Sequence, residues 1–546
     1  MKIEAGQESF SLFGREEILG RLHQRLEALK KGYRQNIGLI GPRFIGKTHL
    51  LAQFLEKARK NPEILPIYIP LAPTDFDGFV ERWVGGLLQS FLMAQGMALP
   101  EEFQSLVKTC RLYIPKTLEH MREAKKRAFQ KKTGLAFREL LNLTAVLREE
   151  TGKKILLVID EFQSLESLEL ADPFSLFGKE MMIQKDTLYL VTSSAPHKAR
   201  EIFHDQLSLL FGNFEVIEVG CLKMESLRSW VHEKYQGLSI SNSDFRILSH
   251  LLNNHPYYFH LFFEHAHVRS LTKVSFAWSR EFLLETIRET LYEDQGFLNH
   301  YFESELQNLL SLGRSYRAHV KILLAVANGR PKLNQIAAYA GKKIQETKKM
   351  LQRLAGEGAI EKRGSFFRLP DPLFRFWLRN VYQIKDRELA PTKERTRATF
   401  ESRLVEEIRK IEEEDRLDLT ARLEGLFREF RNDVVEVSQK KIKCPTFLEI
   451  ASRPTNGRFF PIFSRTSQGR WFCQVFRDSV TEGDVAGFSE ELKKSRRKVQ
   501  RKIMVTLGGI ELNAKLMAQE AKIQIWDLEN LNALFDLYGK LKLIPA

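Results

Sequence analysis

The sequence has few cysteines and no long apolar run. Only four of its 546 residues are cysteine, at positions 110, 221, 444 and 473, and no two of them form a C-x-x-C pair. This spacing excludes a disulfide scaffold and a cysteine-rich zinc site, and it suits a reducing compartment. No apolar run approaches about 18 residues, so we expect no membrane-spanning helix and no membrane partner. The first residues lack the pattern of a secretory signal, and we therefore expect a cytoplasmic protein.

Acidic residues are too few to balance the basic ones. The chain has 84 Lys and Arg against 69 Asp and Glu, a formal net charge of +15, and an otherwise ordinary 43% of hydrophobic residues. That composition excludes disorder or a fibrous structure for the chain as a whole. At roughly 150 residues per domain, the length predicts three or four domains. The basic surplus favours a polyanionic partner, usually nucleic acid, and the alternative is a basic solubilising surface.

A glycine-containing loop lies between an apolar strand at 36–40 and a helix. Residues 41–48 read GPRFIGKT and match G-x-x-x-x-G-K-[ST]. In such a loop the backbone N–H groups and the helix N-terminus hold phosphate oxygens. Lys47 is expected to reach the β- and γ-phosphates of ATP, and the Thr48 hydroxyl is expected to bind Mg²⁺. The predicted nucleotide-binding residues here are Gly41, Pro42, Arg43, Phe44, Ile45, Gly46, Lys47, Thr48 and His49.

Two acidic residues end a second apolar strand, at 153–159. We expect Asp160 to bind Mg²⁺ and Glu161 to orient or deprotonate the attacking water, so Lys47 and Glu161 are the predicted catalytic pair. The next apolar strand ends in Thr192 and is followed by Ser193 and Ser194. These hydroxyls are candidate sensors of the γ-phosphate or water, and helix caps or turns are the alternative.

Apolar strands alternate with helical patterns over residues 1–225. The candidate strands are 36–40, 64–68, 155–159, 188–192 and 215–219. Such alternation predicts an α/β fold, a P-loop NTPase with a parallel sheet covered on both faces. Residues 226–305 are expected to form a helical lid, and 306–385 helices followed by a hairpin. The charged segment 386–399 is a linker or the foot of a helix, and 400–546 form a further α/β domain.

Four short segments resemble archaeal-type and STAND-class P-loop ATPases, which are relatives of the AAA+ origin-recognition proteins. They are FGRE at 13–16, DEFQSL at 160–165, SSAPHKAREIF at 193–203 and NHPYY at 254–258. The resemblance covers about residues 10–385. It implies that Phe13, Gly14 and Arg15 lie near the adenine and that Pro256 lies beside the base.

Two positions depart from the family pattern. Asn213 stands where the family carries an arginine, and Asn254 replaces the usual glycine of the lid segment. The first departure implies slow turnover, or an arginine supplied by Arg200 or by another subunit of a self-oligomer.

Residues 316–378 have the order of a winged helix. A helix at 317–328 precedes a second at 333–340, a turn at Gly341, a third helix at 344–355 and a hairpin around 364–365. The candidate nucleic-acid contacts are Lys342, Lys343, Lys348, Lys349 and Arg353. A lid or protein-docking role is the alternative. The segment DPLFRFWLRN at 371–380 also resembles the archaeal-type ATPases.

The last 125 or so residues resemble the restriction-endonuclease-like fold. The expected elements are helices at 419–430, 488–502, 513–521 and 528–540, and strands at 434–437, 446–451, 458–463, 471–476, 502–509 and 523–527.

Catalysis in that fold requires a carboxylate on one strand and an acid-x-Lys on the next. Gln474 and Phe476 occupy the acid-x-Lys positions, and 460–464 contain no acid, so we expect the domain to be catalytically degenerate. The remaining candidate ligands are Glu424, Glu449 and Asp478. The basic run at 493–502 is either a nucleic-acid contact or a solvated face. Its candidate residues are Lys493, Lys494, Arg496 and Arg497.

These patterns predict an ATP-binding and ATP-hydrolysing switch that uses Mg²⁺ and is associated with nucleic acid in regulation, repair or defence. Two alternatives stay open: an ATP-dependent signalling scaffold whose C-terminal domain binds protein, and an ATP-gated nuclease.

Overall fold

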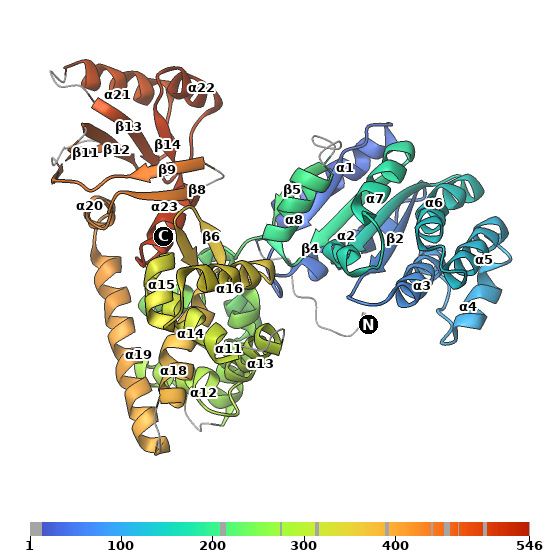
Figure 1. Ribbon diagram of the computed structural model, residues 1–546, viewed down its shortest axis with the longest axis horizontal. Coiled ribbons are helices and arrows are strands. Elements are labelled where there is room, and N and C mark those ends of the chain that lie inside the picture. The colour runs from blue at the N-terminus through green and yellow to red at the C-terminus, as the bar shows by residue number, and fades with distance from the viewer. Residues whose placement is uncertain are drawn as a thin grey trace. The chain divides into compact units, whose positions relative to one another are not determined.

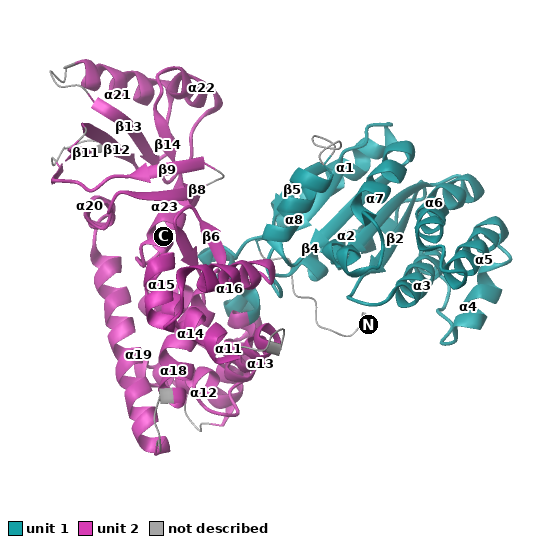
Figure 2. Ribbon diagram, viewed as in Figure 1, with its two compact units in different colours: residues 1–233, 255–257 teal, residues 234–254, 258–546 magenta. Residues whose placement is uncertain are grey.

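The computed structural model divides into two compact units. The first contains residues 1–233 and 255–257, and the second contains residues 234–254 and 258–546 (Figure 2). The structure describes residues 14–207, 214–272, 276–311, 316–387, 392–437, 440–452, 459–467, 469–494 and 499–544. Each unit is described by itself below.

A five-stranded parallel sheet forms the centre of the first unit (Figure 1). Its strand order is β2-β3-β4-β1-β5. The strands are β1 (Asn36–Ile40), β2 (Ile64–Pro70), β3 (Lys154–Asp160), β4 (Thr187–Ser193) and β5 (Phe214–Glu218). Each predicted strand agrees with an observed one to within two residues at either end. The parallel α/β fold predicted from the alternation of strands and helices is therefore confirmed.

Helices cover both faces of this sheet. Alternate β3 residues belong to different cores: Leu156 and Val158 pack with α1 and α2, whereas Ile155 and Leu157 pack with α3, α6 and α7. The helices are α1 (Glu16–Lys30), α2 (Lys47–Arg59), α3 (Phe76–Ala94), α4 (Phe103–Cys110), α5 (Pro115–Phe129), α6 (Thr133–Thr151), α7 (Pro173–Ile183), α8 (Pro196–Glu201) and α9 (Met224–Lys234). Burial on both faces explains why the strands read as continuous apolar runs.

The first part of the second unit is helical. Its helices are α10 (Asn242–Leu251), α11 (Pro256–Leu271), α12 (Arg280–Leu291) and α13 (Phe297–Ser311), and the first residues of α11 belong to the first unit. Then follow α14 (Tyr316–Ala327), α15 (Leu333–Ala340), α16 (Ile344–Gly356), the hairpin β6 (Glu361–Arg363) and β7 (Phe366–Arg368), α17 (Pro372–Trp377) and α18 (Gln383–Arg387). Gly341 ends α15 at φ 66°, a left-handed conformation that glycine adopts without steric cost.

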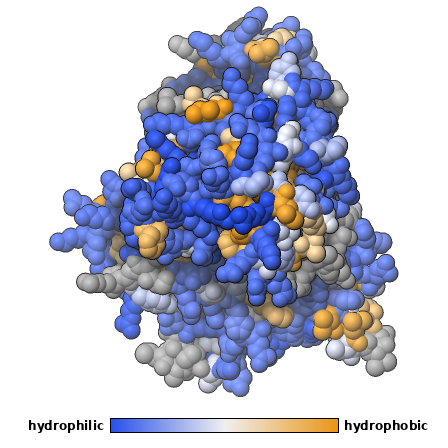
Figure 3. Space-filling model, turned by 90° about the vertical axis from the view of Figure 1, so that its right-hand side faces the viewer, coloured by the Kyte–Doolittle hydropathy of each residue, from blue (hydrophilic) through white to orange (hydrophobic). Residues whose placement is uncertain are grey.

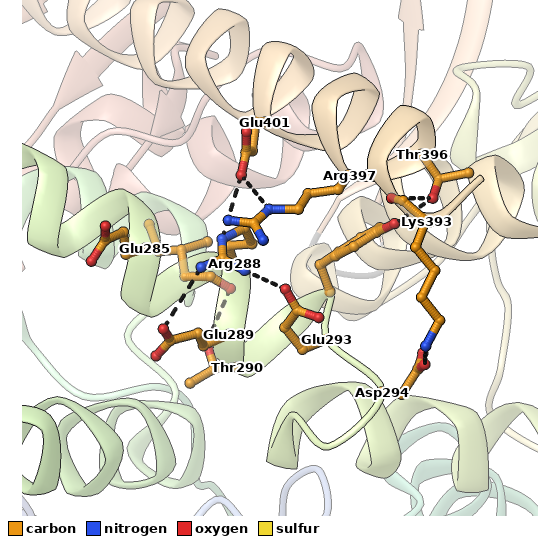
Figure 4. A network of polar contacts seen from close by, with 12 residues as sticks. Glu285, Arg288, Glu289, Thr290, Glu293, Asp294, Lys393, Thr396, Arg397 and Glu401 are labelled. Carbon is orange, nitrogen blue, oxygen red and sulfur yellow. Dashed lines mark hydrogen bonds and ion pairs between the residues drawn. The ribbon is translucent and has the colours of Figure 1, made fainter. Parts of the chain in front are cut away.

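The long helix α19 (Lys393–Arg416) packs against α10 and α12. Figure 4 shows part of the joining polar network, in which Arg288 of α12 contacts both Glu293 and Glu401. Arg397 also pairs with Glu401, at 3.0 Å. The prediction of a linker over 386–399 is thus wrong from residue 393 onward, where the alternative, the foot of a helix, is confirmed. Pro391 lies outside the described residues.

A five-stranded mixed sheet forms the C-terminal part, in the order β10-β11-β12-β13-β14. Strands β10, β11 and β12 are antiparallel, and β12, β13 and β14 are parallel. The elements are α20 (Leu419–Arg428), β8 (Asp433–Val437), β9 (Lys440–Cys444), β10 (Glu449–Ser452), β11 (Phe459–Arg465), β12 (Arg470–Phe476), α21 (Glu482–Lys494), β13 (Val499–Thr506), α22 (Leu512–Glu520), β14 (Gln524–Trp526) and α23 (Leu528–Leu537). Helices α20 and α23 pack on one face, and α21 and α22 on the other.

Several element boundaries in this part differ from the sequence prediction. The helix expected at 488–502 begins earlier, at Glu482, and ends at Lys494, and residues 499–502 belong to β13. Charged residues on a strand hide its pattern: Arg501 stacks on Trp471, 4.5 Å from the ring centre, and Lys502 donates to the Ala521 carbonyl. The strand expected at 446–451 begins only at Glu449, and β9 was not predicted.

No helix in the described part of the chain is long and apolar enough to cross a membrane. The face shown in Figure 3 is mainly hydrophilic, and its hydrophobic residues form small separate groups.

Candidate nucleotide-binding site

The phosphate loop, residues 41–48, connects β1 to α2. A Cβ atom on Gly41 would lie 2.4 Å from the Val219 carbonyl oxygen, so only glycine fits at this position. Gly46 has φ 99° and begins α2 at its N-cap. The predicted strand, loop and helix are therefore in place. Loop residues Pro42, Arg43 and Thr48 are exposed, and His49 contacts Gln53 in the first turns of α2.

The Lys47 ammonium is buried at the base of this loop. Its Nζ donates to the carbonyl oxygens of Gly41 and Pro42, each at 2.8 Å. Burial lowers the pKa of Lys47, although the charges of Glu161 and Asp160 act in the opposite direction. Lys47 therefore lies within electrostatic reach of both acids at the end of β3, as the sequence predicts.

Two hydroxyl groups hold the Asp160 carboxylate. Tyr68 of β2 donates to Oδ2 at 2.7 Å, and Thr192 of β4 donates to Oδ1. Burial and the nearby Asp160 raise the pKa of Tyr68, so the phenol stays protonated as a donor. The sequence prediction does not include Tyr68. The available signal was weak, a single tyrosine in the apolar strand that pairs with β3.

The Glu161 carboxylate is held by the residue that follows β4. Its Oε2 accepts from the Ser194 N–H at 3.1 Å and from the Ser194 hydroxyl at 2.7 Å. Gln163 also donates to this oxygen. Glu161 itself has φ 56°, a left-handed conformation uncommon outside glycine and asparagine. The structure thus brings Ser194 to the predicted catalytic acid, because β3 and β4 are neighbours.

Ser193 has a different environment from Ser194. Its hydroxyl accepts from the Ala195 N–H at 3.1 Å, which is the turn-forming alternative. Its carbonyl accepts from Gly41 N at 3.1 Å and so helps to align β4 with the phosphate loop.

Arg15 forms hydrogen bonds with the backbone of the phosphate loop and of the segment after β5. Its guanidinium donates to the Ile45 carbonyl at 3.2 Å and to the Gly220 carbonyl. Burial lowers the pKa of this arginine. Gly14 has φ 71°, and a Cβ atom there would lie 2.7 Å from the Ser226 hydroxyl. Phe13 lies outside the described residues.

An aromatic stack connects the loop to the segment that contains Pro256. Phe44 has φ 57° and is 52% exposed, and its ring stacks on Tyr257 with the ring centres 4.7 Å apart. Burial lowers the pKa of His255 to about 4, although a hydrogen bond with the Arg43 backbone acts to raise it. Asn254, which replaces the family glycine, has φ 52°. Asparagine tolerates this left-handed conformation better than most residues, which explains the replacement.

Of the two positions that the sequence analysis discusses for an arginine near the phosphates, the structure describes only Arg200. Arg200 pairs with Glu218 at 2.6 Å, so its guanidinium is already engaged in this structure. Asn213 lies outside the described residues.

The predicted nucleic-acid residues fall into three groups. Lys343, Lys348, Lys349 and Arg353 are exposed on or next to α16, whereas Lys342 pairs with Glu346 at 2.7 Å. Lys493 is exposed near the end of α21, and Lys494 is its last residue. Arg496 and Arg497 lie outside the described residues.

The candidate metal ligands of the C-terminal domain do not converge. Glu424 pairs with Arg428 at 3.0 Å, and Glu449 pairs with Arg465 at 3.4 Å. The Gln474 amide contacts Glu491 at 3.3 Å. Among the described residues, no group of three or more His, Cys, Asp or Glu side chains is arranged to hold a metal ion.

The comparisons with known proteins agree with this geometry. Residues 11–177 match the family model described as an AAA ATPase domain. The sheet and phosphate loop are those of a P-loop NTPase, and none of the curated proteins matches the chain.

The solved structures that match include proteins from two archaea. A Walker-type ATPase of Pyrococcus abyssi is 19% identical, with a TM-score of 0.45, over 67% of this chain and 96% of that one. The Aeropyrum pernix ORC2 protein, in ADPNP and ADP complexes, is 12% identical, with a TM-score of 0.43, over 74% and 98%. The Aeropyrum pernix ORC1 protein in complex with DNA is 13% identical, with a TM-score of 0.38, over 67% and 92%.

Proposed function

We propose that this chain binds and hydrolyses Mg²⁺·ATP and acts as a switch associated with nucleic acid. The observation that carries the ATPase part is the buried Lys47, which contacts the phosphate loop carbonyls and lies within electrostatic reach of the acids Asp160 and Glu161. A buried ammonium within electrostatic reach of two carboxylates, at a helix N-terminus that begins with Gly46, is the arrangement that a bound triphosphate requires.

Each group of the site has a chemical role in this proposal. Lys47 exchanges its two loop carbonyls for β- and γ-phosphate oxygens. The Thr48 hydroxyl and the Asp160 carboxylate are oxygen ligands of the kind that Mg²⁺ prefers, and the ion neutralises phosphate charge. Tyr68 and Thr192 fix the Asp160 carboxylate, and Glu161 orients the attacking water.

The contacts of Glu161 suggest an idle state. A carboxylate oxygen that accepts hydrogen bonds from Ser194 and Gln163 is a poorer acceptor for water. In our proposal, closure around ATP releases Glu161 from Ser194, so turnover is slow until that release. The aromatic stack of Phe44 on Tyr257 lies where the phosphate loop meets the segment expected beside the base.

The nucleic-acid part rests on charge. The formal surplus is +15, and Lys348, Lys349 and Arg353 are exposed on α16, the third helix of the proposed winged helix. Exposed cations on one helix suit the phosphate backbone. We propose that the C-terminal domain has a restriction-endonuclease-like fold without nuclease activity, because Gln474 and Phe476 replace the acid-x-Lys pair.

Nucleotide binding is tested by Lys47→Ala, measured by titration calorimetry with Mg²⁺·ATP. Loss of binding is expected, because the variant removes the buried ammonium that is proposed to meet the β- and γ-phosphates. Lys60→Ala is the matched control, since Lys60 directly follows α2 and its ammonium pairs with the exposed Glu56. Equal affinity of Lys47→Ala and the unaltered chain contradicts the proposal.

Nucleic-acid association is tested with the full chain. Labelled duplex DNA and single-stranded RNA are titrated at low salt, with and without Mg²⁺·ATP. Binding that weakens with salt supports the proposal. The absence of binding at low salt in both nucleotide states contradicts it, and then favours the signalling scaffold.

A further inference from the structure

The hairpin β6–β7, which we call the wing, is docked onto β8. Ser365 at its tip donates twice to the Val434 carbonyl, from N at 2.8 Å and from Oγ at 2.9 Å. A Cβ atom on Gly364 would lie 2.2 Å from the same oxygen. Such close approach of two backbones requires glycine, so the sequence Gly364-Ser365 fits this contact as well as the turn.

Buried ionic and aromatic contacts fix the wing on the C-terminal domain. Lys332, directly before α15, pairs with the buried Asp433 at 2.6 Å. Phe366 of β7 packs edge-on against Tyr538, 5.2 Å between ring centres, and belongs to the core of the C-terminal domain. Arg368 of β7 pairs with the buried Asp536. The wing is therefore built into that domain, and the backbone of its tip is hydrogen-bonded to β8.

The surface next to the docked wing is rich in unpaired lysines. Strand β9, which pairs with β8, exposes Lys440, Lys441 and Lys443. The centre of the wing exposes Lys362. Within the part of the chain that the structure describes, none of these four lysines forms an ion pair.

Two of the three acids of the strands β6 to β9 are engaged by residues other than these lysines. Asp433 is buried and paired with Lys332, and Glu361 is held by Arg363 and Arg368. Glu436, opposite Lys441 in the register, is the remaining acid of the four strands β6 to β9.

Many other basic residues of this unit are neutralised. Arg246 pairs with Asp415, Arg280 with Glu412 and Arg379 with Glu407. Lys441 and Lys443 share the face of β9 that is opposite to the core-packed Ile442 and Cys444, and Lys440 is exposed at the start of the strand. Together with Lys362 they concentrate unpaired positive charge around β9 and the wing, although lysines on an edge strand also hinder edge-to-edge aggregation.

We propose that the docked wing and β9 form one composite surface that contacts the phosphate backbone of nucleic acid. This inference rests on the nucleic-acid part of the proposed function and assigns the contact to Lys362, Lys440, Lys441 and Lys443. The wing contributes through Lys362 of its strand, while the backbone of its tip is held against Val434 by hydrogen bonds. Contact with phosphates alone makes the binding salt-dependent and independent of sequence.

The test compares two triple variants of the full chain. Lys440, Lys441 and Lys443 are changed to alanine, and the control changes the exposed Lys321, Lys515 and Lys522 to alanine, which removes the same charge. Affinity for a labelled duplex is measured over a series of salt concentrations. We expect the β9 variant to bind more weakly, and its slope of log affinity against log salt to fall by up to about three, whereas the control keeps most of the slope.

Each outcome decides the inference. Equal loss in both triple variants shows an effect of net charge and overturns the composite surface. Unchanged affinity and slope in the β9 variant also overturn it and leave the proposed function standing, with α16 as the contact. If the unaltered chain binds no nucleic acid at low salt, the proposed function fails with it. Addition of Lys362→Ala to the β9 variant is expected to lower the slope further by about one.

Discussion

The carboxylate of Glu161 and the hydroxyl of Ser194 lie 2.7 Å apart, in hydrogen-bond contact. Strand order makes this contact, because Glu161 follows β3 and Ser194 follows the neighbouring β4. A group proposed to orient water is thus held by a neighbour in this structure. Its release is the step that we expect to control turnover.

Ser194→Ala is expected to raise the basal rate of ATP hydrolysis. The variant removes the hydroxyl bond to Glu161 but keeps the N–H bond, so the carboxylate is released more readily. A hydrogen bond to a charged group contributes about 1.5 kcal/mol, and so the rate is expected to rise by up to about tenfold. The measurement is steady-state phosphate release at saturating Mg²⁺·ATP.

Ser193→Ala is the control for this experiment, because the Ser193 hydroxyl contacts the Ala195 backbone and not Glu161 among the described residues. A lower rate in Ser194→Ala than in Ser193→Ala would mean that Ser194 assists catalysis, which contradicts the idle-state interpretation.

Gly364→Ala is expected to loosen the wing from β8. The new Cβ atom would lie 2.2 Å from the Val434 oxygen, and the residue has φ 69°. The Ser365 amide, which donates to that oxygen, should then exchange its hydrogen faster. Hydrogen exchange resolved over 361–368 gives the measurement.

Gly358→Ala is the control for Gly364→Ala, because it introduces the same backbone strain without a clash with a neighbouring residue. Gly358 has φ 76° with open space around it, so its alanine variant has the left-handed strain alone, about 1 kcal/mol. Equal exchange of the Ser365 amide in the two variants would refute the docking.

The sequence predicted the first unit better than the C-terminal part, for a physical reason. Strands such as β3 are buried on both faces and read as apolar runs with no competing pattern. Strand β13 begins with charged residues whose long side chains pack on Trp471 and on backbone carbonyls, so its start looked like a continued helix. Composition does not reveal that packing.

Some residues of the candidate site could be predicted from the sequence, and their partners could not. Two motifs of contiguous residues predicted Lys47 in the phosphate loop and the acids Asp160 and Glu161 after the strand. The partners of those acids, Tyr68 and Ser194, come from neighbouring strands, and their contacts depend on strand order and side-chain direction. Such contacts become visible only when the sheet is assembled.

Asp536→Asn is expected to destabilise the second unit at neutral pH. Burial raises the pKa of this carboxyl, but the charges of Arg375 and Arg368 outweigh burial and lower it to about 2. The unfolded value is about 3.9, so the charged form stabilises the fold by about 2 kcal/mol above about pH 4. This stabilisation is lost as the pH falls towards 2, through the folded pKa.

The measurement is urea unfolding, followed by tryptophan fluorescence at pH 7 and at pH 3. The difference in unfolding free energy between the unaltered chain and Asp536→Asn should be about 2 kcal/mol or more at pH 7 and smaller at pH 3. Asp386→Asn, at an exposed position, is the control. A difference that does not change with pH would contradict the ionic origin of this stability.

The central claim, that the chain is a hydrolysing switch, is tested most directly by Glu161→Gln. Glutamine keeps the size of the side chain and removes its charge, so Mg²⁺·ATP binding should stay within about twofold while phosphate release falls by about a hundredfold or more. Glu169→Gln makes the same chemical change at an exposed position shortly after Glu161 in the sequence, and it should leave both ATP binding and phosphate release unchanged. Equal phosphate release by Glu161→Gln and the unaltered chain, with binding intact in both, would contradict the account.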